Sequence, residues 1–344
     1  LSVALRVSTD ADGRARNRPG GFYRNRFEHP FEHDGKGACI VQRPGVADDL
    51  LRLGIAAAAR GIAPQRLRQL QAQHNLSDAR MEFMIRDRLS WLRFLGLSLG
   101  DRTPDENTIR HFRNRLTETG TLKRVMKAFD WQLQKKGYIP MSGQIVDASL
   151  VPAPKQRNTE SEREAIKSGM SAKEIWPDEP NKAAQKDTDA RWTKKHGKSY
   201  FGYKASVNVD KRCKLIRKIH VSDAGQGDQR HLPMVLDPMN TNRDLYADRG
   251  YTMTEQIAEQ GVRDCIQRRA QKEQPLTVRQ KQRNQRLAKQ RARVEHVFGA
   301  MEQMGGKFVR CIGLKRADFA IKMKASVYNM QRLVCLKGGV LDPF

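Results

Sequence analysis

Three acidic residues stand out because of the segments in which they lie. Asp147 lies between Val146 and Ala148 in an apolar run that predicts a strand, and Asp248 ends a second strand-like run. Glu295 lies in a segment that predicts a helix. A carboxylate within an apolar strand is costly to desolvate unless it is paired with a positive charge or bound to a metal ion. The combination suggests that the three residues form one site.

Each of the three residues also has an ordinary structural explanation. An aspartate at the end of a strand is commonly a cap, and a glutamate on a helix commonly faces solvent. For Glu295, the neighbours Val294 and Phe298 turn that face of the helix toward the predicted sheet. The candidate site is therefore the trio and no single member of it.

The elements that position these residues are predicted to form an α/β domain. The expected chain order is three strands, a helix, a strand, a helix, a strand and two helices. The predicted strands are 144–151, 200–209, 215–221, 244–247 and 262–267, and the predicted helices are 231–236, 253–260, 282–304 and 320–336. A long basic loop at about 155–198, with one helix near 162–168, separates the first two strands.

An all-α module is predicted before the first strand, at 77–138. Apolar residues recur there at helical spacing. The predicted helices begin at caps at Ser77 or Asp78 and at Asp105 or Asn107, and a third covers 122–135. The arginines of this module either line a DNA backbone or occupy ordinary solvated helix faces.

Residues 1–76 differ in composition from the rest of the chain. The first 80 residues contain 12 Arg but one Lys, Lys36, and neither Met nor Trp. We therefore expect 1–76 to be poorly defined, either disordered or aberrant, for example the product of a frameshift. A start codon other than ATG and a divergent domain are alternatives. One or two short helices are expected within 48–73.

The net charge of the chain indicates a nucleic-acid partner. The 344 residues include 64 Lys and Arg against 38 Asp and Glu, a net charge of +26. Such an excess is the electrostatic footprint of a phosphate binder, with a ribosome-like or membrane-surface protein as the alternative. The longest apolar run, 53–59, is far shorter than the ~20 residues of a membrane span. Five scattered cysteines favour a reduced, cytosolic protein without structural zinc.

Several short motifs occur in order along the chain: NLSD at 75–78, RDRLSWLRFLGL at 86–97, GQIVDA at 143–148, FGYK at 201–204, YADRGY at 246–251, RARVEHVFG at 291–299 and YN at 328–329. In these motifs, over about residues 75–336, the chain resembles insertion-sequence transposases of the IS5 group with the DDE signature. The resemblance implies an RNase H-like catalytic domain at 139–336, followed by a tail at 337–344. It places Asp147 on the first strand, Asp248 after the fourth and Glu295 on the helix after the fifth.

The resemblance also implies a function. It predicts a transposase that binds the terminal inverted repeats of an insertion sequence and catalyses Mg²⁺-dependent DNA cleavage and strand transfer. Asp147, Asp248 and Glu295 would be both catalytic residues and metal ligands, for two Mg²⁺ ions with Mn²⁺ as a substitute. Carboxylate oxygens suit Mg²⁺, and two ions ~4 Å apart can activate the attacking hydroxyl and stabilise the leaving oxygen.

The implied partners are double-stranded DNA, as repeat ends and as target, and further copies of the chain in a synaptic complex. The implied location is the bacterial cytoplasm, at the nucleoid. Two alternatives stay open. One is a catalytically defective DNA-binding relic of such a transposase, and the other is an RNase H-like nuclease acting on RNA hybrids or junctions.

Basic residues near Glu295 are the expected DNA contacts. Arg291 resembles the arginine of the family element Tyr-x2-Arg-x3-Glu-x6-Lys and would hold a phosphate. The chain departs from that element at Ala288, in the tyrosine position, and at Glu302, in the lysine position, with Lys307 among the candidate substitutes. The expected DNA-binding residues are Arg291, Arg293, Lys289, Lys204 and Arg249.

Three further residues have two explanations each. His296 is either a proton shuttle or a packing or phosphate-contact residue. Trp176 and Trp192, in the basic loop, either stack on a base or anchor the loop on the protein.

Overall fold

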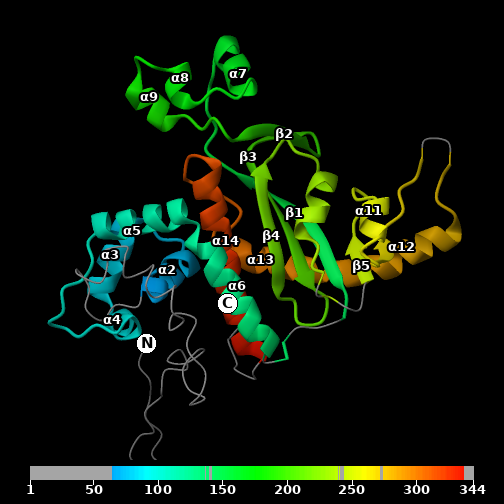
Figure 1. Ribbon diagram of the computed structural model, residues 1–344, viewed down its shortest axis with the longest axis horizontal. Helices are drawn as coiled ribbons and strands as arrows, with labels where there is room; N and C mark the ends of the chain where they lie inside the picture. The colour runs from blue at the N-terminus through cyan, green and yellow to red at the C-terminus, as the bar shows by residue number, and fades with distance from the viewer. Residues whose placement is uncertain are drawn as a thin grey trace, which may run out of the picture. The chain divides into compact units, whose positions relative to one another are not determined.

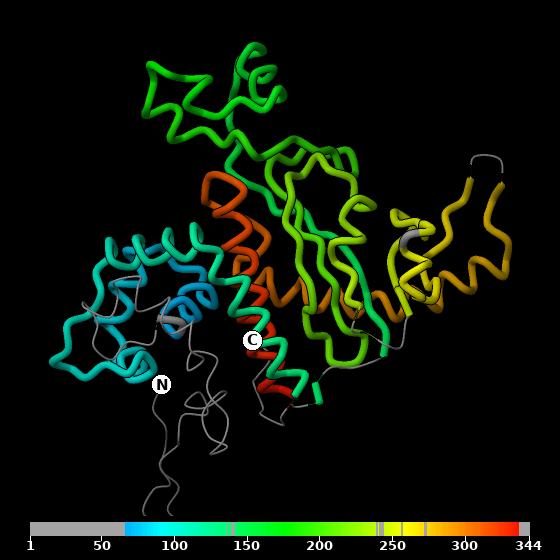
Figure 2. Tube along the Cα trace, viewed as in Figure 1, coloured from blue at the N-terminus to red at the C-terminus, as the bar shows by residue number. Residues whose placement is uncertain are grey.

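A mixed sheet of six strands follows a group of helices in the computed structural model (Figure 1). The structure describes residues 64–135, 137–138, 142–238, 240, 244–271 and 274–336, all within the unit Ala38–Phe344 (Figure 2). The expectations for 1–63 and for the tail at 337–344 lie outside these residues. None of the described helices is both long enough and apolar enough to span a membrane.

The strand order is β2-β3-β1-β5-β6, and β4 also pairs with β3. The strands are β1 (Gln144–Pro152), β2 (Arg191–Lys195), β3 (Lys198–Asp210), β4 (Ile216–Asp223), β5 (Asp244–Ala247) and β6 (Arg263–Ile266). β2 and β4 pair with successive parts of one edge of β3, and β1 lies antiparallel along its other edge. β5 is parallel to both β1 and β6. This arrangement confirms the predicted α/β class and is consistent with an RNase H-like fold.

Strand β2 lies inside the segment that the sequence predicts as a loop, so that prediction was wrong there. Three of its five residues are charged, which hides the apolar alternation typical of a strand. His196 and Gly197 both have positive φ, the conformation of a tight two-residue hairpin turn, and this turn pairs β2 with β3. Pairing with a neighbouring strand therefore stabilises a segment whose composition is typical of a loop.

The rest of the basic loop contains three short helices that lie together (Figure 1). They are α7 (Glu160–Lys167), close to the one predicted helix, α8 (Ala172–Ile175) and α9 (Pro180–Gln185). Trp176 is buried, and its indole N–H donates to Glu162 Oε1 at 2.8 Å, so this tryptophan anchors the segment on itself. Trp192 is half exposed, with its ring centroid 5.3 Å from that of Phe201.

Alternating residues of β1 divide the hydrophobic core between the two faces of the sheet. Ile145 faces the core formed with α13 (Arg293–Gln303) and α14 (Leu314–Leu336). Val146 faces the opposite core, formed with α10 (Leu232–Val235) and α11 (Glu255–Ala258). A short 3₁₀ helix, Asp228–His231, precedes α10.

The single helix predicted at 282–304 is two helices that meet at Ala292. α12 (Val278–Arg291) has no buried residue, whereas α13 buries Val294, Val297 and Phe298 against the sheet. Because α12 is not buried and α13 packs against the sheet, no single apolar face continues through both helices. The sequence pattern does not mark this break.

The helical group consists of α2 (Pro64–Gln73), α3 (Asp78–Asp87), α4 (Leu89–Leu95), α5 (Glu106–Thr119) and α6 (Thr121–Lys135). The predicted caps are confirmed, because Ser77 Oγ accepts from Arg80 N and Asp105 Oδ1 accepts from Thr108 N. The short helix expected within 48–73 is α2. Helices α2, α5 and α6 contact α14, which joins this group to the sheet.

Gly202, in the FGYK motif, is required by close packing of β3 on β1. Its φ is +150°, and a Cβ there would lie 2.5 Å from Val151 O and 2.7 Å from Ala153 N. We expect Gly202→Ala to lower the free energy of unfolding by about 3 kcal/mol, because backbone cannot move aside cheaply. Chemical denaturation tests this. Gly299→Ala is the matched control, because a Cβ there meets nothing within 4 Å, and an equal loss in both variants contradicts the explanation.

Candidate catalytic site

The pairing of β1 with β5 brings Asp147 and Asp248 to the same part of the sheet. Ile145 is registered with Tyr246, the last pair of the two strands, and Asp147 and Asp248 follow two residues further along each chain. Asp248 lies close enough to Asp147 to act on its carboxylate electrostatically. Ile145 and Tyr246 both belong to the core that includes α13. Residues two positions apart share a face, so Asp147 lies on the α13 side of the sheet. Asp248 follows the end of β5 and accepts from Gly250 N at 2.8 Å.

Asp147 is largely buried, with its side chain 14% exposed. Its Oδ2 lies 2.5 Å from Nη1 of Arg291, and its Oδ1 accepts from the N–H of Ala148 at 2.8 Å. Burial raises the pKa of Asp147 to about 6, opposed by Arg291 and by the Ala148 N–H. The carboxylates of Asp248 and Glu295 raise this pKa further, so both lie close enough to act electrostatically on Asp147.

Glu295 reaches the same cluster from α13. Its Oε1 lies 3.7 Å from Arg291 Nη1, and its side chain is 61% exposed. Arg291 therefore links Asp147 to Glu295 across the junction of α12 and α13. The structure brings the three predicted acidic residues to one region, with a guanidinium among them.

The described residues contain no ready-made cluster of three acidic, histidine or cysteine side chains that could hold a metal ion. The donor chemistry nevertheless fits Mg²⁺, because all three side chains offer carboxylate oxygens. Arg291 supplies the positive charge at Asp147 in this structure. Its Nε is buried without a hydrogen-bond partner among the described atoms.

Tyr251 is a residue of this region that the sequence did not single out. Its side chain is buried, and its hydroxyl has no hydrogen-bond partner among the described atoms. Burial raises the pKa of Tyr251, and Asp228, Asp147 and Asp248 raise it further. The tyrosine is visible in the YADRGY motif, but only the fold shows that its hydroxyl lies near the carboxylates.

The predicted DNA-binding residues lie in different places. Lys289 is exposed on α12, Arg249 is exposed directly after Asp248, and Arg293 donates to Lys211 O at 2.8 Å. Lys204 on β3 pairs with Leu150 on β1, so both side chains lie on the same face of the sheet. Leu150 is an odd number of residues, three, from Asp147, and side chains alternate along a strand, so this face is opposite to that of Asp147. The structure therefore does not bring Lys204 to the acidic cluster.

Lys204 has partners of its own on that opposite face. Its Nζ lies 2.7 Å from Asp228 Oδ1 and donates to Gln226 O at 2.5 Å. His296 is exposed beside Glu295. Glu302, in the lysine position of the family element, pairs with Lys307 at 2.5 Å.

The raised pKa of Asp147 predicts a pH effect on the metal-free protein. The pKa is about 6 in the folded state and ~3.9 in the unfolded state, so folding favours the protonated acid. The resulting stabilisation is full below pH ~4 and is lost as the pH rises through ~6. In EDTA, the free energy of unfolding of Asp147→Asn relative to that of the unaltered chain should therefore increase by up to about 3 kcal/mol as the pH rises from 4 to 7. Denaturation curves at several pH values measure this difference in stability. A difference that does not change with pH contradicts the prediction.

Comparison with known proteins identifies two matching family models. One, described as a transposase DDE domain, matches residues 139–330, and the other, described as a transposase domain (DUF772), matches residues 65–115. The chain is 30% identical over 230 residues to the transposase for insertion sequence element IS1106 of Neisseria meningitidis serogroup B. That match covers 65% of this chain and 74% of the relative. No solved structure matches the chain.

Proposed function

The chain belongs to the family of transposases with a DDE domain, and on that premise we propose that it binds the terminal inverted repeats of an insertion sequence and cleaves and rejoins DNA there. The observation that carries the proposal is that Arg291 contacts both Asp147 and Glu295, and that Asp248 lies close enough to Asp147 to act on it electrostatically. We further propose that copies of the chain assemble on DNA in a synaptic complex, in the bacterial cytoplasm at the nucleoid.

Members of this family generally use a divalent metal ion. In the proposed reaction, Asp147, Asp248 and Glu295 would hold Mg²⁺ or Mn²⁺, which when bound activates the attacking hydroxyl and stabilises the leaving oxygen. Arg291 keeps Asp147 in position and neutralises part of the acidic charge before substrate arrives. Its guanidinium geometry also suits a backbone phosphate.

Helix α12 is the proposed DNA-contacting surface next to this site. It carries no acidic residue and no buried one. Arg283 is committed to the protein, since it donates to the carbonyls of Ile266 and Asp264. Lys281, Arg286 and Lys289 are exposed.

Changing Lys281, Arg286 and Lys289 together to Gln is expected to weaken binding to every DNA duplex alike. Each lost phosphate contact should reduce the slope of log affinity against log salt by about 1. Fluorescence anisotropy at several salt concentrations measures both effects. A matched control removes three charges from α7 and α8, at Arg163, Lys167 and Lys173, and an equal effect of both triple variants contradicts the assignment of the surface to α12.

Cleavage of a duplex that carries the element's own ends, in Mg²⁺, tests the proposed function. The expected result is cutting at the repeat end, and none on a duplex of scrambled sequence. Salt-dependent binding without cutting overturns the catalytic part and indicates the relic, which Ala288 and the Glu302–Lys307 pair favour. Cutting of RNA–DNA hybrids without preference for the ends indicates a nuclease instead.

A further inference from the structure

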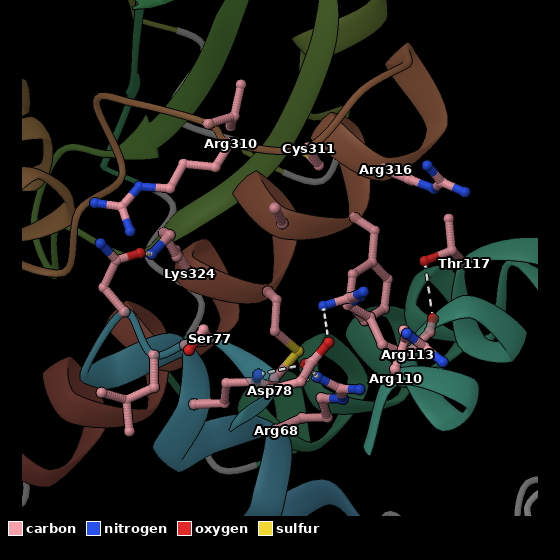
Figure 3. Close-up of a pocket in the computed structure, with 18 of the residues that line it drawn as sticks. Arg68, Ser77, Asp78, Arg110, Arg113, Thr117, Arg310, Cys311, Arg316 and Lys324 are labelled. Carbon is pink, nitrogen blue, oxygen red and sulfur yellow. Dashed lines mark hydrogen bonds and ion pairs between the residues drawn. The ribbon is translucent and has the colours of Figure 1, made fainter. Parts of the chain in front are cut away.

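A second site lies away from the acidic cluster, where α2, α3 and α5 meet the segment 308–324. The structure has a pocket there of about 540 Å³ (Figure 3). None of its lining residues belongs to the candidate catalytic site. A volume of this size is typical of a small-molecule site and far exceeds what a single phosphate ion fills.

The pocket is strongly cationic. Six lining residues are basic, namely Arg68, Arg110, Arg113, Arg310, Arg316 and Lys324, and the one acidic lining residue is Asp78. The Asp78 carboxylate is already engaged, because it accepts from Arg113 at 2.5 Å and from Gln71 at 2.8 Å. Figure 3 shows Arg310 and Lys324 on one side of the pocket and Arg316 and Arg113 on the other. One carboxylate cannot neutralise these six cations.

Two of the cations are buried without full compensation. Lys324 is 6% exposed, and its ammonium donates to Asn75 Oδ1 and Met304 O, which are neutral acceptors. Arg68 is 3% exposed, and its Nε has no hydrogen-bond partner among the described atoms. Its Nη atoms donate to Gln71 Oε1 and Ile109 O, and Nη1 lies 3.9 Å from the Asp78 carboxylate that Arg113 also engages. Burial lowers the pKa of Lys324 to about 8 and that of Arg68 to about 9. Buried charges are normally paired, so an anion in the pocket would relieve this cost.

Part of the remaining wall of the pocket is apolar and includes an exposed aromatic ring. Phe308 lines the pocket and is 44% exposed, and Phe319 and Met323 also line it. Arg310 and Arg316 are exposed, and within the described part of the chain neither side chain makes an ion pair. Exposed guanidiniums beside an exposed ring can contact a phosphate and a planar base together.

We propose that this pocket binds one nucleotide unit, with its phosphate among the arginines and its base against Phe308. The unit is either a free nucleotide or an unpaired nucleotide at the end of a DNA strand. Binding of an unpaired nucleotide at a DNA end rests on the proposed function, whereas binding of a free nucleotide does not. A base stacked inside an intact duplex does not expose its faces to such a wall.

Calorimetric titration of the full chain with dAMP and with inorganic phosphate tests the site. We expect dAMP to bind at least about tenfold more tightly than phosphate, a difference of about 1.4 kcal/mol. Arg316→Ala, Arg310→Ala and Phe308→Leu should each weaken dAMP binding by about tenfold. Lys315→Ala, the exposed neighbour that does not line the pocket, should leave it unchanged. Equal affinity for dAMP and phosphate, or equal effects of Lys315→Ala and Arg316→Ala, overturns the proposal.

Competition experiments identify the source of the nucleotide. If it is a DNA end, a duplex with one unpaired terminal nucleotide should bind more tightly than a blunt duplex, and dAMP or Arg316→Ala should abolish the difference. If it is a free nucleotide, dAMP binds but the two duplexes bind alike. Asp147→Asn should retain dAMP binding, so a failure of the catalytic proposal is distinguished from a failure of this one. Thermal denaturation of each variant verifies that it is folded.

Discussion

Asp147→Asn is expected to slow cleavage of a DNA end by at least about 1000-fold and to leave DNA affinity nearly unchanged. The change removes the negative charge from a largely buried member of the acidic cluster while preserving the shape of the side chain. Charge stabilisation at a metal-dependent phosphoryl-transfer site contributes several kcal/mol to the barrier, and each ~1.4 kcal/mol is a factor of ten in rate. Single-turnover cleavage at saturating protein measures the effect apart from binding.

The matched control for this variant is Asp130→Asn. Burial raises the pKa of Asp130 to about 6, as it does for Asp147, but Asp130 lies on α6 beside Arg217. We expect its cleavage rate to change by less than about threefold, because no part of the acidic cluster contacts it. A cleavage rate of Asp147→Asn within tenfold of that of the unaltered chain contradicts the assigned role of Asp147. An equal loss of cleavage rate in Asp147→Asn and Asp130→Asn also contradicts it.

Arg291→Ala is expected to have two effects, one on stability and one on cleavage. Without the guanidinium, Asp147 loses a partner at 2.5 Å and Glu295 one at 3.7 Å, so the carboxylates repel one another. The free energy of unfolding in EDTA should fall by about 1–3 kcal/mol, since the Asp147 charge is left buried and unpaired. Addition of Mg²⁺ should restore more stability to this variant than to the unaltered chain.

The cleavage rate of Arg291→Ala should fall by about 100-fold, because the phosphate loses a charge-assisted hydrogen bond next to the site. Arg291→Lys should be intermediate, since lysine keeps the charge but not the planar fork. Arg286→Ala, an exposed position on the same helix, is the control and should affect only DNA affinity. Equal stability of Arg291→Ala and Arg286→Ala in EDTA contradicts the linking role of Arg291.

The sequence predicts the positions of the acidic residues better than their surroundings. The apolar runs around Ile145 and Tyr246 predict strands β1 and β5, and the aspartates follow from those strands by local spacing. Arg291 and Glu295 are only four residues apart, so their proximity also follows from their short separation in the sequence, although the helix is broken between them at Ala292. The contact between Arg291 and Asp147 depends on tertiary packing and is not visible in the sequence.

Other features could not be predicted because distant segments create them. Lys204 lies on the face opposite to Asp147 because of its pairing register with β1, which the FGYK motif does not encode. Strand β2 depends on pairing with β3 across the turn at His196 and Gly197. The cationic pocket draws Arg68, Arg113 and Arg316 from separate parts of the chain, so its charge is spread over segments that each look ordinary.

The most direct test of the acidic cluster is iron-mediated cleavage of the protein backbone. Fe²⁺ is loaded in place of Mg²⁺ on the full chain with its DNA end, and ascorbate and peroxide then generate radicals that cut the chain next to the bound ion. We expect cuts near residues 147, 248 and 295 together, suppressed by excess Mg²⁺ and lost in Asp147→Asn but not in Asp130→Asn. Cuts confined to one of these positions, or cuts that persist in Asp147→Asn, would contradict a shared metal site.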